Sequence, residues 1–367
     1  MMFKTYLLIF FLFVAILAEE QPFKKIIHNT DPKAKCVDGS SPAIYLHQGN
    51  EPNNFIIFFV GGGACFGGNT DQVIESCYQR SKTDLGSSKN LKDEQFYNGG
   101  YLSTDPSRNK FASWTKVVIQ YCDGAFHQGA NEESIKYKDT ELYFRGAYNT
   151  RSHFQYLVDN YNFKNAEKVV LTGSSAGGIA SFLWNNYVRS LLVNPDALVA
   201  VPDSGVFTNV VSPVKGISVF DLILKNLFKL SNTDEKTPSP RCNSQFEGEE
   251  YKCFFIENIY SSLEGRILLV QSQYDSTLIP LGLNINCIQK VTIGHSLATC
   301  TPEEMGHIEA YRQSFLNFAN KFLNFSENNN LWAISCSHHG YGFRGEFYDN
   351  EGQRVPSVTG LTLKEAV

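Results

Sequence analysis

The sequence has no strong excess of charge of either sign, and this absence limits the partners that it can be expected to bind. Its formal net charge is −5, and 19% of its 367 residues are charged. A mildly acidic chain offers no basic surface to neutralise the phosphates of a nucleic acid. Composition therefore gives no reason to expect a nucleic-acid-binding protein.

Long hydrophobic runs are absent beyond the N-terminus. The apolar run Tyr6–Leu17 follows Lys4 and ends just before Ala18, and it is shorter than the roughly 20 residues that span a bilayer. A basic residue, a short apolar run and a small residue are typical of a signal peptide, with a membrane anchor as the alternative. We expect residues 1–18 to be a signal peptide, residues 19–367 to form a single catalytic domain, and the protein to be secreted or to enter the secretory-lysosomal lumen.

Cysteine, in contrast, is not scarce. Nine cysteines in a chain expected to be secreted indicate disulfide bonds. Three short spacings and one longer loop suggest the pairs Cys65–Cys77, Cys242–Cys253, Cys287–Cys300 and Cys36–Cys122. The number is odd, so one thiol stays free or bonds another chain, and these pairs leave Cys336 over.

Apolar segments alternate along the chain with segments of helical periodicity. We expect strands at residues 55–60, 117–121, 168–172, 197–201, 266–271 and 331–335, and helices at residues 145–161, 176–191 and 301–322. Such alternation implies an α/β fold, with a mostly parallel sheet, right-handed crossovers and helices on both faces. The sequence contains no internal repeat and no low-complexity linker that would suggest a second domain.

The turn after the strand at residues 168–172 is the most informative feature of the chain. It reads Gly173-Ser174-Ser175-Ala176-Gly177, which is the sequence form of the nucleophile elbow of α/β-hydrolases. Glycines flank the serine because the turn is too tight for a Cβ on either side. The turn also places the Ser175 hydroxyl beside the N-terminus of a helix, where developing negative charge is favoured. These features predict an α/β-hydrolase fold with Ser175 as the nucleophile.

A serine hydroxyl needs a base to take its proton and a third group to orient that base. In α/β-hydrolases an Asp or Glu and then a His follow the serine in the chain. His338 and His339 directly follow the strand at residues 331–335, and the pattern alone does not separate them. Asp203 and Asp275 each follow an expected strand, and Asp275 has a slight advantage because it lies closer to where a late acid belongs.

A glycine-rich loop supplies candidates for the oxyanion hole. Rigid N–H donors stabilise a tetrahedral oxyanion by about 3–4 kcal/mol each, and in these folds one of them belongs to the residue after the nucleophile, here Ala176. Further donors come from a glycine-rich loop after an early strand, and Gly61-Gly62-Gly63 follows the strand at residues 55–60. A phosphate-binding loop is the rival interpretation, but it would need a lysine that this loop lacks. We expect no metal and no cofactor.

Together these residues resemble the pectin acetylesterase family, which includes the animal Notum carboxylesterases. The similarity covers about residues 36–367, with its blocks in the family's order. The similar blocks are Cys36–Ala43, Gly61–Cys65, Asp84–Lys89, Tyr121–Gly124, Phe144–Ala147, Ser174–Gly178, Asp203–Gly205, Tyr274–Ser276, Ser335–His339 and Val358–Val367. So many blocks in one order make the resemblance specific.

The resemblance decides between the alternatives that the pattern leaves open. It implies Ser175 as nucleophile, Asp275 as acid and His339 as base. It implies an oxyanion hole formed by the N–H groups of Gly62, Gly63 and Ala176. His338 stands where familiar members have no histidine, so it is expected to be incidental.

Two departures from the family pattern bear on the substrate. Val60 stands where the family usually has Glu, and Ala64 stands where plant members carry Trp and Notum members carry Tyr. The position of Ala64 borders the acyl pocket of the family, so the loss of a large ring would widen that pocket. The residues that match the fatty-acyl pocket of Notum are Phe207, Phe254 and Phe255. Simple core packing is the alternative role for these three rings.

The sequence thus predicts a secreted serine carboxylesterase that acts on an ester substrate. Acetyl removal from a polysaccharide, as in pectin acetylesterases, is the leading expectation, and removal of a longer acyl chain from a protein or lipid is the second. A protease is a further alternative, because the same triad cleaves amides. A non-catalytic binding protein on this fold would require a broken triad, whereas every triad position is filled.

Overall fold

A computed structural model describes residues 20–28, 30–231, 239–292, 294–348 and 362–367. The expected signal peptide, residues 1–18, lies outside the described residues. The strands are β1 (Phe23–Ile27), β2 (Ala43–His47), β3 (Glu51–Phe59), β4 (Glu94–Gln95), β5 (Trp114–Ile119), β6 (Ile135–Tyr137), β7 (Thr140–Leu142), β8 (Lys168–Ser174), β9 (Leu198–Asp203), β10 (Arg266–Ser272), β11 (Gln289–Lys290), β12 (His295–Ser296) and β13 (Asn329–Ile334).

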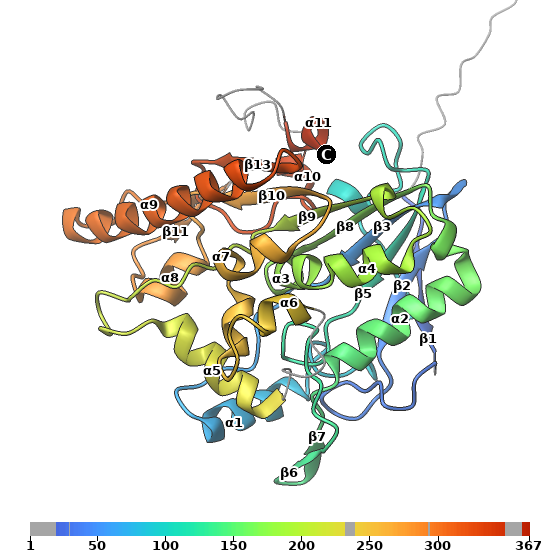
Figure 1. The fold of residues 1–367 in the computed structure, drawn as a ribbon, viewed down its shortest axis with the longest axis horizontal. Helices are drawn as coiled ribbons and strands as arrows, with labels where there is room; N and C mark the ends of the chain where they lie inside the picture. Colours follow the sequence, from blue (N-terminus) through green and yellow to red (C-terminus); the bar gives the residue numbers. More distant parts are fainter. Residues whose placement is uncertain (1–19, 29, 232–238, 293, 349–361) are drawn as a thin grey trace, which may run out of the picture.

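Helices connect and cover these strands (Figure 1). The α-helices are α1 (Thr70–Arg80), α2 (Gly146–Tyr161), α3 (Ala176–Leu183), α4 (Asn185–Leu191), α5 (Val219–Ser231), α6 (Pro240–Asn243), α7 (Ile256–Ile259), α8 (Leu278–Leu283), α9 (Pro302–Phe325), α10 (Gly345–Tyr348) and α11 (Leu363–Ala366). The 3₁₀ helices are η1 (Gly100–Leu102), η2 (Phe163–Asn165), η3 (Pro195–Ala197), η4 (Glu250–Phe254) and η5 (Tyr260–Ser262).

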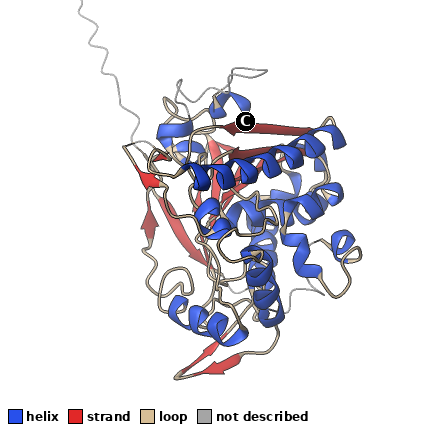
Figure 2. Ribbon diagram, turned by 90° about the vertical axis from the view of Figure 1, so that its left-hand side faces the viewer, coloured by secondary structure: helices blue, strands red, loops and turns tan. Residues whose placement is uncertain are grey.

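Nine strands form one sheet in the order β13-β10-β9-β8-β3-β5-β2-β1-β4. Neighbours from β13 through to β5 are parallel, whereas β2, β1 and β4 add antiparallel pairs at the far edge. Figure 2 shows the twist expected of so large a sheet. The carboxyl ends of the six parallel strands meet at one edge of the sheet, which is where α/β folds bind their ligands.

The register of the central strands places the glycine loop beside the elbow. Phe59, the last residue of β3, lies opposite Gly173 of β8. Gly61-Gly62-Gly63 therefore leaves the sheet next to Ser175. Ser174 lies opposite Asp203, the last residue of β9.

The core occupies both faces of the sheet, but the helices cover the faces unequally. Phe55, Ile57 and Phe59 of β3 pack on one face, in a large cluster that includes buried side chains of α1, α2, α3, α5 and α9. Ile56 and Phe58 point to the other face, where the smaller cluster includes side chains of η1, α10 and α11. The alternation follows from the pleat of a strand, because successive side chains point to opposite faces.

Two of the expected helices illustrate how local sequence sets the boundaries. The helix α9 begins with a capping box between Thr301 and Glu304, as the Thr-Pro-Glu-Glu pattern indicates. The expected helix over residues 176–191 is instead divided into α3 and α4 at Trp184, where the backbone ψ is −4°. The Trp184 indole is fully buried and donates to the backbone oxygen of His127 at 3.1 Å.

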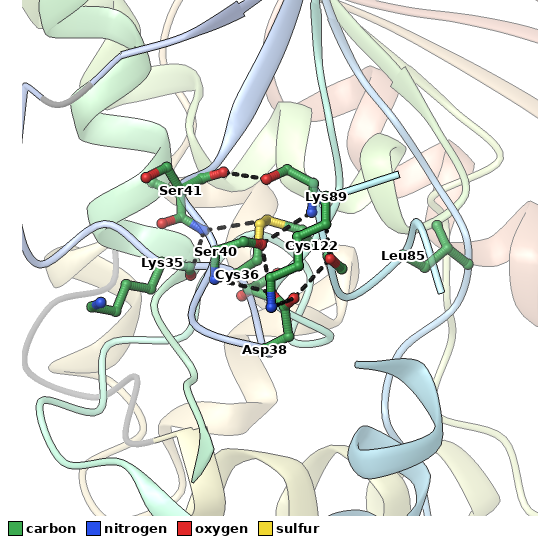
Figure 3. The surroundings of a disulfide bond; sticks show 12 residues. Lys35, Cys36, Asp38, Ser40, Ser41, Leu85, Lys89 and Cys122 are labelled. Carbon is green, nitrogen blue, oxygen red and sulfur yellow. Dashed lines mark hydrogen bonds and ion pairs between the residues drawn. A yellow bond between two sulfur atoms is a disulfide. The ribbon is translucent and has the colours of Figure 1, made fainter. Parts of the chain in front are cut away.

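The four disulfides have the pairing suggested by the spacing, and Cys336 is the free cysteine. Figure 3 shows the bond between Cys36 and Cys122, which joins the segment before β2 to the segment that follows β5. Beside it the Asp38 carboxylate pairs with the Lys89 ammonium at 2.9 Å. Disulfides of this kind persist in oxidising compartments outside the cytosol.

Candidate active site

Ser175 lies in a strained turn between β8 and α3. Its φ of +60° and ψ of −121° belong to a region that residues other than glycine rarely occupy. A Cβ on Gly173 would lie 2.4 Å from the backbone oxygen of Gly177, and a Cβ on Gly177 would lie 1.9 Å from the backbone oxygen of Phe59. The two flanking glycines are therefore required by close backbone contacts, as the elbow motif predicts.

His339 and Asp275 are brought together by two neighbouring parallel strands. His339 follows β13 and Asp275 follows β10, and the His339 Nδ1 lies 2.8 Å from both carboxylate oxygens of Asp275. With Nδ1 donating to the carboxylate, Nε2 is the nitrogen left to accept a proton. Within the described residues this Nε2 makes no hydrogen bond, and His339 lines the same cleft as Ser175.

The electrostatics of this pair favour a basic imidazole. Burial opposes the charged form of His339, but the Asp275 carboxylate and its hydrogen bond outweigh burial, so the pKa of His339 is raised. Asp275 is itself fully buried and accepts the backbone N–H groups of Thr277 and Leu278 at 2.9 Å, together with the Gln271 amide at 2.9 Å. These donors fix the carboxylate in the orientation that His339 requires.

Asp203, the other acid that the sequence leaves open, holds the histidine loop, and within the described residues it makes no hydrogen bond to the His339 ring. Its Oδ2 accepts the backbone N–H groups of Tyr341 at 2.6 Å and Gly342 at 2.8 Å. Ser204 donates to its Oδ1 at 2.9 Å and accepts the Gly340 N–H at 2.8 Å. Burial raises the pKa of Asp203 to about 6. The strand-end pattern found this carboxylate but gave no signal of its role in positioning the loop.

His338 does not line the cleft. It is 6% exposed, and its ring lies 5.8 Å from that of His295 and 5.5 Å from that of Tyr341. Burial, with the Arg344 charge as a second cause, lowers the pKa of His338 to about 4. The His338 imidazole is therefore neutral at pH 7. It packs among buried rings, whereas the His339 imidazole lines the cleft.

The glycine loop forms one wall of the same cleft. Gly61, Gly62 and Gly63 all line it, and the φ angles of Gly62 and Gly63 are +132° and +66°. A Cβ on Gly61 would lie 2.2 Å from the backbone oxygen of Ser174. Ala176 is the first residue of α3, where backbone N–H groups lack partners within the helix.

The cleft measures about 670 Å³ and is open to solvent. Its lining residues are Phe58, Val60, Gly61, Gly62, Gly63, Phe96, Tyr97, Asn98, Gly99, Leu102, Gln120, Ser174, Ser175, Thr277, His339, Phe343 and Arg344. Apart from Val60, its apolar wall is not predicted by the sequence. Phe58 could have been found from its position at the end of the strand that leads into the glycine loop, but Phe96 and Phe343 lie in irregular segments in which no sequence pattern marks them.

The four residues expected to form an acyl pocket are not among those that line this cleft. Ala64, Phe207, Phe254 and Phe255 are each at most 8% exposed and belong to the larger core cluster. Phe126 lies between two of them, with ring centroids 6.4 Å from Phe207 and 5.6 Å from Phe254. Phe207 and Phe254 therefore pack with Phe126 in a closed, buried aromatic cluster.

Neither a metal-binding cluster nor a membrane-spanning helix is found in the described part of the chain. No group of three or more His, Cys, Asp or Glu side chains there could hold a metal ion. None of the described helices has the length and apolar character needed to cross a membrane.

Comparison with known proteins gives related sequences in plants and animals. The sequence profile described as Pectinacetylesterase matches residues 18–367. Pectin acetylesterases 4 and 5 of Arabidopsis thaliana are 29% and 30% identical over 315 residues, which is 83% of this chain and 73% and 70% of theirs. The palmitoleoyl-protein carboxylesterase NOTUM of Schmidtea mediterranea is 29% identical over 274 residues, which is 70% of this chain and 49% of its own length.

A solved structure shares the fold. The Wnt deacylase Notum from Drosophila superposes with a TM-score of 0.77 at 21% identity, covering 94% of this chain and 91% of that one. The fold is thus the α/β fold expected from the sequence. Because the profile match extends over almost the whole length, the chain belongs to the pectinacetylesterase family of carboxylic ester hydrolases.

Proposed function

We propose that this chain is a secreted serine carboxylesterase in which Ser175 is the nucleophile, His339 the general base and Asp275 the group that orients the base. The observation that carries the proposal is the 2.8 Å contact of the His339 Nδ1 with Asp275, in a cleft shared with a serine on a strained elbow. This arrangement has the parts that a Ser-His-Asp hydrolase requires.

The proposed reaction proceeds through two tetrahedral intermediates. His339 Nε2 takes the Ser175 proton as Oγ attacks the ester carbonyl, and the N–H groups of Gly62, Gly63 and Ala176 stabilise the oxyanion. Collapse expels the alcohol, which receives the proton from His339, and leaves an acyl-serine. Water, activated by the same imidazole, then releases the carboxylic acid and restores the serine.

Acetyl removal from a polysaccharide is the proposed use of this chemistry. The relatives named pectin acetylesterase support it, and so does the open cleft, which can admit a large alcohol. Notum-like removal of a longer acyl chain is the second candidate, supported by the relatives named palmitoleoyl-protein carboxylesterase. The four disulfides support secretion, with residues 1–18 as signal peptide and 19–367 as one catalytic domain.

The acyl length decides between these substrates. We expect kcat/KM on p-nitrophenyl esters to rise from acetate to about octanoate, because Ala64 takes the place of a large ring at a position that borders the acyl pocket of the family, where Phe207 and Phe254 match pocket residues. Each acyl CH₂ that becomes buried adds up to about 0.8 kcal/mol, or about fourfold in kcat/KM. The two rings are packed in the core, so an acyl chain can enter only if they rotate.

The matched variant for this series is Ala64→Trp, which should remove the gain with acyl length and leave acetate hydrolysis largely intact. Ala64 is buried outside the cleft lining and has no proton chemistry, so in a variant that thermal unfolding shows to be folded the change should be confined to long esters. If the enzyme cleaves the acetate ester but has no activity on the butyrate or octanoate ester, the aromatic cluster around Phe207 and Phe254 does not open to an acyl chain. The substrate would then be an acetyl ester alone.

The two buried aspartates should respond differently to the same substitution. Asp275→Asn should lower kcat on the order of 10⁴-fold, because the amide no longer holds His339 in the tautomer with a free Nε2. Asp203→Asn keeps an oxygen that can accept the N–H groups of Tyr341 and Gly342. The Asp203→Asn substitution should therefore lower kcat by no more than about tenfold, which corresponds to the net free energy of one hydrogen bond. Steady-state kinetics on p-nitrophenyl acetate, with thermal unfolding of each variant, measures both effects, and an equal loss from the two substitutions would contradict this division of roles.

A further inference from the structure

Arg80, the last residue of α1, reaches back to the glycine loop. Its Nη2 donates to the backbone oxygen of Gly62 at 2.9 Å, and its Nε donates to the backbone oxygen of Leu85 at 2.9 Å. We propose that Arg80 is a positioning residue that orients the Gly62–Gly63 peptide, so that the Gly63 N–H faces the oxyanion. The proposal rests on the proposed function, since only an ester under attack needs this donor.

The geometry of one peptide bond links Arg80 to the cleft. The oxygen of Gly62 and the N–H of Gly63 belong to the same planar unit, and in a trans peptide they point in opposite directions. No cis peptide bond occurs among the described residues. Gly62 and Gly63 line the cleft with Ser175, whereas Arg80 does not. An oxygen that is held on Arg80 therefore directs the N–H away from α1 and toward the cleft.

This peptide needs an external anchor because its own residues do not fix its plane. Both glycines have positive φ, +132° and +66°, and glycine has little steric preference between the alternative orientations. On the side of α1 the loop is bounded by Leu85, whose Cδ2 would lie 2.7 Å from a Cβ on Gly62. Leu85 limits the space, but Arg80 supplies the directional contact.

Arg80 is itself held in place from several sides. Its guanidinium carbon lies 4.6 Å from the centre of the Tyr121 ring, which is fully buried. The disulfide between Cys77 of α1 and Cys65, which closely follows the glycine loop in the sequence, links the helix to that loop. A rigid guanidinium loses little conformational freedom when it forms its hydrogen bonds. The helix, the disulfide and the arginine thus act as one support for the glycine loop.

The positive charge of Arg80, and not only its geometry, should help the Gly63 N–H to stabilise the oxyanion. None of the ion pairs in the described residues includes Arg80, so its guanidinium is in direct contact with no carboxylate there. A cationic donor on a carbonyl polarises the amide and makes its N–H a stronger donor. That gain matters most when the oxyanion has formed, so it should appear in kcat more than in KM.

The test uses the full-length mature enzyme and three substitutions that separate geometry from charge. Arg80→Met removes both the hydrogen-bond donors and the positive charge. Arg80→Gln keeps a neutral donor, and Arg80→Lys keeps the charge. Lys82→Met is the matched control, because Lys82 is an exposed cation whose ammonium lies 3.8 Å from the centre of the Tyr78 ring, and within the described residues it makes no hydrogen bond or ion pair with the glycine loop. For each variant, kcat and KM are measured on p-nitrophenyl acetate, and thermal unfolding reports the fold.

A second measurement responds to the oxyanion hole and not to general stability. A trifluoromethyl ketone is attacked at its carbonyl carbon by the Ser175 Oγ, whose proton passes to His339, and the product is a hemiketal oxyanion. The corresponding methyl ketone resembles the ground state. The ratio of the two inhibition constants therefore measures stabilisation of the oxyanion itself.

We expect Arg80→Met to lower kcat by about 10- to 100-fold with KM changed by less than about threefold, since outright loss of one oxyanion donor costs about 10²–10³. Binding of the trifluoromethyl ketone should weaken by a similar factor, and binding of the methyl ketone should stay the same. Arg80→Lys and Arg80→Gln should each recover part of the loss. Lys82→Met should match the wild type.

Two results would overturn the proposal. One is an unchanged kcat in Arg80→Met, and the other is a lower kcat with undiminished selectivity for the trifluoromethyl ketone. If Arg80→Met does not fold, the same comparisons with Arg80→Lys and Arg80→Gln decide the question. Failure of the proposed function is recognised separately, because hydrolysis would then survive Ser175→Ala whatever the Arg80 series shows.

Discussion

Ser175→Ala should abolish ester hydrolysis while the protein still folds. Loss of the nucleophile of a Ser-His-Asp triad costs on the order of 10⁶-fold in kcat, because the acyl intermediate forms on its Oγ. Alanine fits the site, since it removes a single Oγ from a backbone conformation that the adjacent glycines already permit. Hydrolysis of p-nitrophenyl acetate by purified wild type and variant measures the loss, and thermal unfolding checks the fold.

The neighbouring serine provides the matched control. Ser174 is the last residue of β8, is 6% exposed and also borders the cleft, but it does not have the positive φ of the elbow. Ser174→Ala should therefore cost far less than Ser175→Ala. Comparable activity in wild type and a folded Ser175→Ala enzyme would remove the basis of the whole mechanism.

The parallel part of the sheet could be predicted from the sequence, whereas the antiparallel edge could not. Strands such as β3 and β10 are buried on both faces, so they appear as continuous apolar runs. The strand β1 contains two lysines and has only one fully buried residue, Phe23, and β4 has two residues. Such short or polar strands are defined by their partners, which a local pattern does not reveal.

The same distinction applies to the candidate site. The elbow and the glycine loop could be found because tight backbone turns require glycine, which is visible in the sequence. The contacts of Asp203 with the histidine loop and of Arg80 with Gly62 join residues 138 and 18 positions apart. No local pattern encodes them. The expected acyl pocket depended on side chains whose packing against Phe126 is likewise a property of the tertiary structure.

His339→Ala should abolish activity, with a loss on the order of 10⁶-fold in kcat, and His338→Ala should not. Of the two histidines, His339 is the one that contacts the Asp275 carboxylate and lines the cleft, whereas the His338 ring packs against His295 and Tyr341. Removing the His338 ring from this buried site should lower the free energy of unfolding and leave kcat within about tenfold of the wild type, because it leaves the triad contacts in place. Kinetics and thermal unfolding of the two variants separate these roles.

The pH dependence of kcat/KM gives an independent test of the same assignment. A general base works only when it is neutral, so activity should fall as the pH drops through the pKa of the base in the free enzyme. The Asp275 carboxylate raises the pKa of His339 above the ordinary value of 6.5, so the acidic limb should lie above pH 6.5. Burial lowers the pKa of His338 to about 4, so a His338 base would keep the enzyme active to near that pH. An acidic limb near pH 4, or an inactive His338→Ala variant beside an active His339→Ala variant, would show that the base has been assigned to the wrong histidine.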